Sequence, residues 1–331
     1  MKNLEQFIEL RNAGRMAAFL QKLEKKQPVS ICFLGGSITS GFKIDEKHCF
    51  VNLFKQWLDE TYPENSITIY NLAIAGTPSI FGLYQCLQYL GHYDPDLVFI
   101  EYAINDMKND EHQSAFESLV YSCLLMKKNP GVVLLLAKSQ VGYTCQNYMD
   151  MVAEHYNQPS IFVGKAVDTI AWENYSDDYG HPNQKGHRLI SDLIITLFTM
   201  AKTTAKEIKV PASYQLPDKA FYNNDLSQFV FQNKIWEYRG NGKNISVQFC
   251  ETCRYLYLLY YSSIEDCYGD TELLIDGQKL ETLSGYRINN WDHLMGHIVF
   301  LSDKPKKHSI CLKMQTGEED KFFSLQNIGF C

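Results

Sequence analysis

Three residues stand in settings that would let them act together in nucleophilic catalysis. Ser37 lies in the turn Gly35-Gly36-Ser37, directly after a short apolar run, and the glycines let the backbone turn tightly and leave the hydroxyl reachable. His181 lies far along the chain, and Asp178 precedes it by three residues. A serine hydroxyl that loses its proton to a histidine, which a carboxylate orients in turn, is an arrangement suited to acyl transfer.

The residues around His181 predict that its ring projects from a loop. Pro182 disfavours a helical conformation at the preceding residue and suits the first turn of the helix expected over residues 184–202. Across Gly180, the carboxylate of Asp178 can fold back to accept the Nδ1–H of the histidine. That hydrogen bond would fix the tautomer that presents Nε2 to a serine hydroxyl.

The glycine-rich turn that holds Ser37 could also serve other chemistry. A turn of this kind between a strand and a helix can cradle a phosphate, but the sequence lacks a P-loop lysine and a G-x-G-x-x-G spacing there. It also differs from the G-x-S-x-G elbow of α/β-hydrolases, because Thr39 occupies the position of the second glycine. The turn alone therefore does not show whether Ser37 is catalytic or part of a structural loop. The pair Asp178 and His181 favours a catalytic serine.

Gly76 and Asn105 supply hydrogen-bond donors after two further predicted strands. Gly76 can offer its backbone N–H without a side chain in the way, and Asn105 can offer its side-chain NH₂. Together with the backbone N–H of Ser37, they form a candidate oxyanion hole. Removing one such donor typically costs about 2.7–4 kcal/mol of transition-state stabilisation. Taken singly, however, the glycine is typical of a loop and the asparagine of a helix cap.

Alternating strands and helices are expected to position these residues. Two helical segments, 4–10 and 15–25, come first, and amphipathic stretches separate the apolar runs that follow. The apolar runs predict buried strands at residues 29–34, 67–72, 97–102, 132–136 and 160–163. Such alternation implies a parallel sheet with helices on both faces, and ligands of these sheets bind at the C-terminal ends of the strands.

The four residues Ser37, Gly76, Asn105 and His181 occur in the order that names the SGNH hydrolases, also called GDSL-like esterases. The chain resembles this family over residues 28–202. The resemblance implies a flavodoxin-like sheet of five parallel strands, a catalytic triad of Ser37, Asp178 and His181, an oxyanion hole of Ser37, Gly76 and Asn105, and an acyl-enzyme intermediate. It also implies that no metal and no organic cofactor is needed.

Two positions differ from the most common family pattern. The first block reads Gly35-Gly36-Ser37 rather than Gly-Asp-Ser, a variation common among the family members that act on carbohydrates. Ala103 stands where many relatives have a glycine two residues before the asparagine. Because the side chain of Asn105 would donate the hydrogen bond, we expect this second difference to be tolerated.

The character of the sequence changes after the last predicted helix. Pro211 and Pro217 lie in a segment without apolar periodicity, which predicts a linker over residues 206–220. Beyond it, alternating apolar residues and an Asp276-Gly277 hairpin signal predict an all-β sandwich. We therefore expect a catalytic domain over residues 1–205 and a β-sandwich domain, similar to carbohydrate-binding modules, over residues 221–331.

Composition and charge exclude several classes of partner. The chain has 331 residues and a net charge of −7, which argues against nucleic-acid or anionic-membrane binding. It has no apolar run of about 18 residues and no signal peptide at its start, so we expect a cytoplasmic protein. The ten cysteines are expected to be free thiols, and the lone pair Cys250 and Cys253 does not predict a zinc site.

The appended β domain is the main guide to the substrate. The two-domain organisation resembles that of the intracellular carbohydrate acetylesterases of gut bacteria, which implies removal of O-acetyl groups from mannan or xylan fragments. The domain is rich in aromatic residues, which stack well on sugar rings but could equally fill the sandwich core. Trp291, beside Asn290 in a polar stretch, is the best candidate for an exposed ring that contacts an oligosaccharide ester.

Other activities remain open on the same triad. A general short-chain esterase, a lysophospholipase or a thioesterase would use Ser37 in the same way, and a sugar O-acetyltransferase would pass the acyl group to a second sugar instead of water. The sequence identifies neither the sugar nor the hydroxyl position that carries the acyl group, and it leaves the oligomeric state open.

Overall fold

The computed structural model describes residues 4–11, 14–205, 210–211, 213–222, 232–234, 238–239, 246–286 and 293–331. The chain divides into two compact units, Met1–Leu226 and Ser227–Cys331, and each has its own hydrophobic core. All ten cysteines are free thiols. Among the described residues, none of the helices combines the length and the apolarity needed to cross a bilayer.

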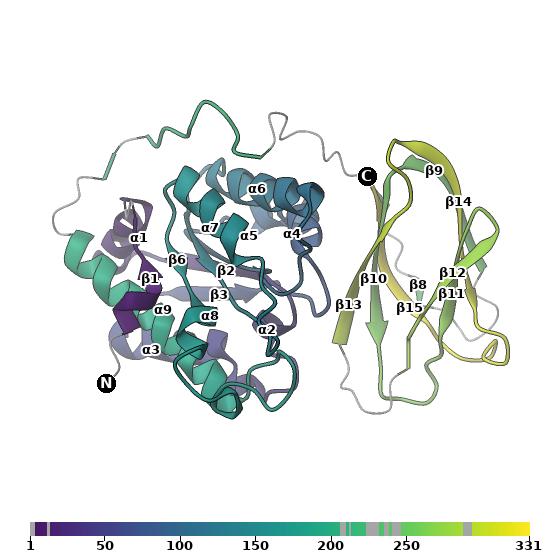
Figure 1. Ribbon diagram of the computed structural model, residues 1–331, viewed down its shortest axis with the longest axis horizontal. Helices are drawn as coiled ribbons and strands as arrows, with labels where there is room; N and C mark the ends of the chain where they lie inside the picture. The colour runs from purple at the N-terminus through teal and green to yellow at the C-terminus, as the bar shows by residue number, and fades with distance from the viewer. Residues whose placement is uncertain are drawn as a thin grey trace. The chain divides into compact units, whose positions relative to one another are not determined.

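A six-stranded sheet lies at the centre of the first unit (Figure 1). Its strands are β1 (Ile8–Glu9), β2 (Val29–Gly35), β3 (Ile67–Asn71), β4 (Leu97–Glu101), β5 (Gly131–Leu135) and β6 (Ser160–Ile161). They lie in the order β1-β6-β5-β4-β2-β3, and the last five of these are parallel, which confirms the predicted flavodoxin-like order. β4 and β5 are buried along their whole length, as continuous apolar runs predict.

Helices cover both faces of this sheet (Figure 1). They are α1 (Gly14–Glu24), α2 (Ser37–Ser40), α3 (Phe50–Thr61), α4 (Ser79–Gln85), α5 (Gly91–Tyr93), α6 (Asp110–Leu124), α7 (Gln146–His155), α8 (Val163–Val167) and α9 (Gln184–Ala205). Shorter turns are η1 (Leu4–Phe7), η2 (Glu46–His48), η3 (Cys86–Leu90, π-helical) and η4 (Trp172–Asn174). On the face of α1, α3 and α9, the ring of Phe54 makes edge contacts with Phe33, Phe99 and Phe198, which joins helices to strands.

The predicted helix over residues 4–10 is wrong in its second half. Only η1 is helical, and Ile8 and Glu9 form β1, which pairs antiparallel with Ile161 and Ser160 of β6. The sheet therefore has one more strand than the five predicted. A two-residue strand has no periodicity of its own, and it forms here because the edge of β6 offers unpaired backbone groups.

The second unit consists of two antiparallel sheets. Their strands are β7 (Gln232–Lys234), β8 (Tyr238–Arg239), β9 (Ser246–Cys253), β10 (Tyr255–Ser262), β11 (Thr271–Ile275), β12 (Gln278–Leu283), β13 (His293–Phe300), β14 (Lys306–Met314) and β15 (Ser324–Phe330). One sheet has the order β13-β10-β15-β7, with β8 also on β15, and the other has the order β12-β11-β14-β9. Side chains from both sheets share one core, so the unit is a sandwich as predicted.

Two left-handed residues close the predicted hairpin of the second unit. Asp276 (φ 53°) and Gly277 (φ 81°) connect β11 to β12, as an Asp-Gly pair at a two-residue turn should. In the other sheet, Leu256 and Leu258 of β10 are fully buried in the core between the two sheets.

Residues 213–222, which we call the strap, pack against the first unit. The ring of Tyr214 lies 4.4 Å from the guanidinium carbon of Arg15. At the other end, the buried carboxylate of Glu117 on α6 accepts the backbone N–H groups of Phe221 and Tyr222. The strap thus lies within the first unit, although most of it falls in the predicted linker and Phe221 was the predicted start of the β domain.

Candidate active site

The residues predicted to form the site all lie at the C-terminal edge of the parallel sheet. Ser37 is the first residue of α2, directly after β2. Gly76 and Asn105 lie in the loops that follow β3 and β4. Asp178 and His181 lie in the loop that leads from η4 into α9. This is the edge at which open parallel sheets bind ligands.

The side chain of Asn105 lies close to the backbone of Gly36 in the turn that precedes Ser37. A Cβ at Gly36 would lie 2.6 Å from the side-chain Oδ1 of Asn105, so this position accepts no side chain without displacement of the amide. The Gly36 N–H donates to the carbonyl oxygen of Glu101 (3.3 Å), which ties the turn to β4. Gly41, with φ 79°, then ends the short helix α2. Ser37 itself is 8% exposed.

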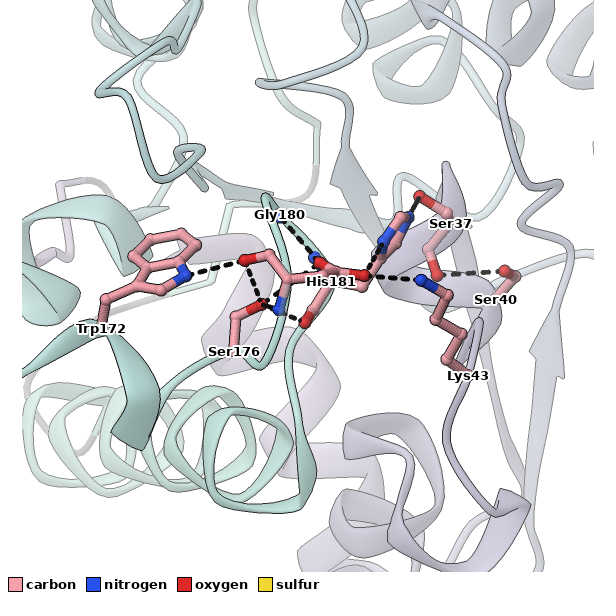
Figure 2. Close-up of polar contacts among 8 residues, drawn as sticks. Ser37, Ser40, Lys43, Trp172, Ser176, Gly180 and His181 are labelled. Carbon is pink, nitrogen blue, oxygen red and sulfur yellow. Dashed lines mark hydrogen bonds and ion pairs between the residues drawn. The ribbon is translucent and has the colours of Figure 1, made fainter.

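Ser37, His181 and Asp178 form a continuous hydrogen-bonded chain (Figure 2). The Oγ of Ser37 lies 3.0 Å from Nε2 of His181, although 144 positions separate the two residues. The Nδ1 of the same ring lies 3.0 Å from Oδ2 of Asp178. A carboxylate only accepts hydrogen bonds, so Nδ1 carries the hydrogen and Nε2 of the neutral ring is free to accept the serine proton.

The loop that carries the histidine is held by contacts from its own residues (Figure 2). The hydroxyl of Ser176 donates to the carbonyl oxygen of His181 (2.6 Å) and accepts the N–H of Asp178 (3.1 Å). The indole N–H of Trp172 donates to the carbonyl oxygen of Asp178 (2.8 Å). Asn183 then caps α9 by accepting two backbone N–H groups of its first turn. These hydrogen bonds hold the loop in one conformation, and the loop orients the ring of His181.

The carboxylate of Asp178 is held in its charged form. Oδ1 accepts the N–H groups of Gly180 (2.9 Å) and His181 (2.8 Å), and Oδ2 also accepts a hydrogen bond from Nζ of Lys43 (2.8 Å). Partial burial opposes the charge, but the hydrogen bonds from Lys43, the two backbone N–H groups and the His181 ring outweigh it and hold the pKa of Asp178 well below its usual range. The residue is therefore a charged acceptor near neutral pH.

His187, the second histidine of this region, is not available as a base. It is fully buried on α9, its Nδ1 accepts the backbone N–H of Phe50 (3.2 Å), and its ring stacks on that residue. Burial, and after it the nearby His181, lowers the pKa of His187 to about 4. The ring is therefore neutral near neutral pH and packs the interior.

The three predicted oxyanion donors lie on adjoining segments. The side-chain amide of Asn105 lies directly over Gly36. The loop after β3 runs alongside the end of β2, where the N–H of Ile74 donates to the carbonyl oxygen of Gly35 (3.0 Å), and Gly76 follows with φ 80°, a left-handed conformation that favours glycine. Within the described part of the chain, neither the N–H of Ser37 nor the side-chain NH₂ of Asn105 donates a hydrogen bond elsewhere.

Asp106, next to Asn105, fixes the loop that carries this amide. It is 1% exposed, and its carboxylate accepts the backbone N–H of Ser79 at the start of α4 (2.6 Å) and the hydroxyl of Tyr148 on α7 (2.8 Å). Its carbonyl oxygen accepts the hydroxyl of Tyr143 (2.6 Å). The sequence offered a helix cap as one reading of the neighbouring Asn105, but it could not show that three distant segments converge on Asp106.

Glu101 is a buried carboxyl group beneath the nucleophile turn. It ends β4 beside Gly35, is 1% exposed, and its Oε2 accepts the hydroxyl of Thr39 on α2 (3.1 Å). Burial raises the pKa of Glu101 to about 7, against the hydrogen bonds from Thr39 and the Gly36 N–H that lower it. Sequence reasoning missed this group, because a glutamate at the end of an apolar strand carries no motif.

The residues predicted to bind sugar in the second unit, Trp291 and Asn290, lie outside the described residues. In the first unit, three exposed apolar side chains lie on loops at the same edge of the sheet as the proposed site. Met107 is 60% exposed in the loop of Asn105, Tyr179 is 57% exposed between Asp178 and His181, and Val141 is 72% exposed in the loop after β5. The last two loops are joined by the N–H of Gln140, which donates to the carbonyl oxygen of Tyr179 (2.8 Å).

No metal-binding arrangement is present within the described residues: they contain no cluster of three or more His, Cys, Asp or Glu side chains placed to hold an ion. What the site does contain is a hydroxyl beside the acceptor nitrogen of an oriented imidazole, with hydrogen-bond donors near the hydroxyl. This set of groups is suited to attack on a carbonyl carbon and to stabilisation of the oxyanion that results.

Comparison with known proteins agrees with this chemistry. The sequence profile of the GDSL-like Lipase/Acylhydrolase family matches residues 33–189, which include all the residues predicted to form the site in the first unit. No curated protein is significantly similar to the chain in sequence.

Solved structures share the fold of the whole chain. A two-domain esterase (CEX) active on acetylated mannans is 20% identical, with a TM-score of 0.75 over 99% of this chain and 98% of that one. The same esterase co-crystallised with mannopentaose is 21% identical, with a TM-score of 0.73 over 99% of this chain and 97% of that one. At these identities the likeness establishes the two-unit fold. Through residues 33–189 of its α/β unit, the chain is similar to the GDSL-like Lipase/Acylhydrolase family.

Proposed function

We propose that this protein is a serine esterase that removes O-acetyl groups from carbohydrates. The observation that carries the proposal is the continuous chain from the hydroxyl of Ser37 through the ring of His181 to the carboxylate of Asp178, with 3.0 Å at each step. In this proposal Ser37 is the nucleophile, His181 is the general base and acid, and Asp178 orients the ring.

The reaction takes place in two halves. In the first, Ser37 attacks the ester carbonyl while Nε2 of His181 takes the hydroxyl proton, and the same nitrogen then protonates the leaving sugar oxygen as the C–O bond breaks. In the second half, His181 takes a proton from water, which attacks the acyl-serine, and acetate leaves with the proton returned to Ser37. Because its carboxylate is held charged, Asp178 stabilises the imidazolium present between the two proton transfers.

The oxyanion formed in each half is stabilised by the N–H groups of Ser37 and Gly76 and by the side-chain amide of Asn105. The amide of Asn105 lies against Gly36, directly beside the nucleophile, which supports its assignment. The Oδ1 of the same side chain is buried and has no partner among the described residues, so the amide is oriented by packing. Donors placed in advance of the reaction require no reorganisation when charge develops on the carbonyl oxygen.

Two observations support a carbohydrate ester as the substrate. The fold of the whole chain, including the β-sandwich unit, is that of an esterase active on acetylated mannans. In addition, Met107, Val141 and Tyr179 expose apolar surface on loops at the same edge of the sheet as Ser37. Apolar and aromatic side chains pack well against the C–H faces of sugar rings.

The test is mass spectrometry of acetyl loss from acetylated manno- and xylo-oligosaccharides incubated with the full-length protein. We expect acetyl groups to be released as acetate, and we expect Ser37→Ala to reduce the rate by on the order of 10⁴- to 10⁶-fold. Ser40→Ala is the matched control, because Ser40 lies in the same helix and its hydroxyl only donates to the carbonyl oxygen of Ser37 (3.1 Å). Losing that bond should cost less than about tenfold.

Other outcomes would replace parts of the proposal. A preference for 4-nitrophenyl esters longer than about eight carbons over the acetate ester would identify a lipid esterase. Acetyl transfer to an added acceptor glycan would identify a transferase. Full activity in Ser37→Ala would reject the nucleophile itself.

A further inference from the structure

One oxygen of the proposed triad has two cationic or potentially cationic partners (Figure 2). Oδ2 of Asp178 lies 3.0 Å from Nδ1 of His181 and 2.8 Å from Nζ of Lys43. The two backbone N–H groups that bind this carboxylate, those of Gly180 and His181, both donate to the other oxygen, Oδ1. The ammonium group and the imidazole therefore share a single acceptor atom.

The segment that places Lys43 starts from the nucleophile. After α2 ends at Gly41, the N–H of Phe42 donates to the carbonyl oxygen of Ser37 (3.0 Å), and the ring of Phe42 lies 4.7 Å from the ring of His181. Lys43 follows with φ 65°, a left-handed conformation that costs a side-chain-bearing residue free energy and that glycine or asparagine adopts more readily. The segment that follows Ser37 thus passes the ring of His181 and places the ammonium group of Lys43 against Asp178.

Sharing the acceptor has an electrostatic consequence. The carboxylate of Asp178 favours the imidazolium form of His181, whereas a positive charge on the same oxygen disfavours it. Other charged groups in the region do not supply the same effect. Asp177 accepts a hydrogen bond from the amide of Asn183 (2.9 Å), and His187 is buried and neutral. Among the described residues, Lys43 is the cation whose ammonium bonds the Asp178 carboxylate and offsets its charge at the ring.

We propose that Lys43 is a positioning residue that sets the pH range of the enzyme by sharing Oδ2 of Asp178 with His181. The inference rests on the proposed function, in which neutral His181 is the base. The ammonium disfavours the imidazolium form of the ring, so the esterase works further into the acid range. Lys43 touches neither the substrate carbonyl nor the nucleophile.

The test compares the pH profiles of kcat/KM for 4-nitrophenyl acetate between full-length wild-type protein and Lys43→Met. Methionine keeps an unbranched side chain, one atom shorter than that of lysine, and removes the charge. We expect the acidic limb of the profile to move up by roughly half to one pH unit, with the plateau at high pH within about threefold of wild type. At pH 6 this shift appears as a loss of about three- to tenfold. Because the lysine side chain is 55% exposed, 1 M NaCl should reduce the shift.

Two further variants separate a charge effect from a structural one. Lys43→Arg keeps the charge and should restore the wild-type limb. Lys47→Met is the matched control, because Lys47 lies four residues further on, in η2, and pairs with Asp45 (3.3 Å). We expect its profile to be that of wild type. An equal fall in rate at every pH in Lys43→Met, or an unmoved limb, would overturn the proposal.

A readout that needs no catalysis keeps the inference separate from the proposed function. The imidazole of His181 can be titrated by NMR in the Ser37→Ala background, with its signal assigned from His181→Gln. A rise in the pKa of the ring on Lys43→Met would support the shared acceptor even if the acetyl ester were not hydrolysed. An unchanged titration would reject it even if the esterase were active.

Discussion

Asp178 and Glu101 are both connected to the nucleophile turn, yet their pKa values shift in opposite directions. Asp178 is partly exposed and receives hydrogen bonds from an ammonium, two N–H groups and an imidazole, which hold its pKa well below the usual range. Glu101 is 1% exposed, and burial raises its pKa to about 7. The first is suited to stabilise a cation during the reaction. Glu101 is largely neutral near pH 6 and accepts a hydrogen bond from the hydroxyl of Thr39.

Glu101→Gln tests the state of the buried group. The unfolded chain has a glutamate pKa of about 4.3, below the folded value, so the native state holds the proton more tightly. This contribution to the free energy of unfolding is fully present below about pH 4 and is lost as the pH rises through 7, by up to ~3 kcal/mol. We expect urea unfolding of wild-type protein to show this fall between pH 5 and pH 8.

The glutamine variant should lack most of that fall, since its amide keeps an acceptor for Thr39 and never ionises. Loss of esterase activity in urea provides a probe that reports on the first unit alone. Equal losses of stability in Glu101→Gln and wild type would contradict the prediction, because they would show that Glu101 does not lose its proton between pH 5 and pH 8.

At the scale of elements, the end of β2 and the loop after β4 are fitted to each other through Gly36. A Cβ there would meet Oδ1 of Asn105 at 2.6 Å, and both neighbouring segments are fixed, the turn by its bond to Glu101 and the loop by Asp106. The amide of Asn105 is therefore the group that must move when a side chain is added. Gly36 also accounts for the Gly-Gly-Ser form of the first sequence block in this chain.

Gly36→Ala should reduce kcat by about 10²- to 10³-fold, the usual effect of losing one oxyanion donor. Asn105→Ala should have a similar effect, and the double variant should be little worse than either single one, because both changes remove the same donor. Gly91→Ala is the control, since no atom lies within 4 Å of its added Cβ, and its kcat should match that of wild type. Additive losses in the double variant would show that the two residues act independently.

Much of this arrangement could be predicted because strand ends fix positions. The predicted strand at residues 97–102 is β4 (Leu97–Glu101), and a continuous apolar run is sufficient to find it, since helices cover both faces. Ser37 and His181 could be brought together from sequence because one follows a strand directly and the other precedes the helix α9. Parallel strand ends meet at one edge of a sheet, so the 144 positions between them did not matter.

What could not be predicted depends on contacts between distant segments. β1 exists because β6 offers an unpaired edge, and Lys43 bonds Asp178 from 135 positions away. Neither segment has a periodicity or a motif that would identify its partner. The strap is a further example, since Pro217, with Pro211 just before the strap, is typical of a linker, while Glu117 binds the strap's backbone.

Glu117 and the strap give a second prediction at the scale of elements. The carboxylate of Glu117 is fully buried and accepts two backbone N–H groups of the strap and the hydroxyl of Tyr156 (2.7 Å). Glu117→Gln exchanges one acceptor oxygen for a donor, so one strap N–H would face an NH₂ group, at a cost of about 1–3 kcal/mol. We expect faster trypsin cleavage after Lys219 in the full-length protein, measured by mass spectrometry.

Glu154→Gln is the comparison for that experiment, because Glu154 lies exposed on the neighbouring α7. Its cleavage rate after Lys219 should equal that of wild type. If Glu117→Gln is cleaved no faster, the strap is held by its ring contacts, such as that of Tyr214 over Arg15, rather than by the carboxylate.

At the scale of the whole molecule, the proposed catalytic residues all lie in one of the two units. Every residue of the proposed triad and oxyanion hole belongs to Met1–Leu226, which also has its own core. The strap belongs to this unit as well, so a shortened chain must keep it. Ending at residue 205 would leave the buried carboxylate of Glu117 without its backbone partners, a loss that destabilises any protein.

A chain that ends at Leu226 should therefore fold and hydrolyse 4-nitrophenyl acetate with a kcat/KM within about threefold of the full-length value, because this small ester needs only the groups of the first unit. Acetylated mannooligosaccharides probe more of the molecule. If the β-sandwich unit takes part in binding the sugar, kcat/KM for the oligosaccharide should fall by tenfold or more while that for the small ester holds. If kcat/KM of the shortened chain matches that of the full-length protein for both substrates, substrate recognition is restricted to the first unit. If kcat/KM falls equally for both, the shortened chain is damaged, and its thermal unfolding would reveal this.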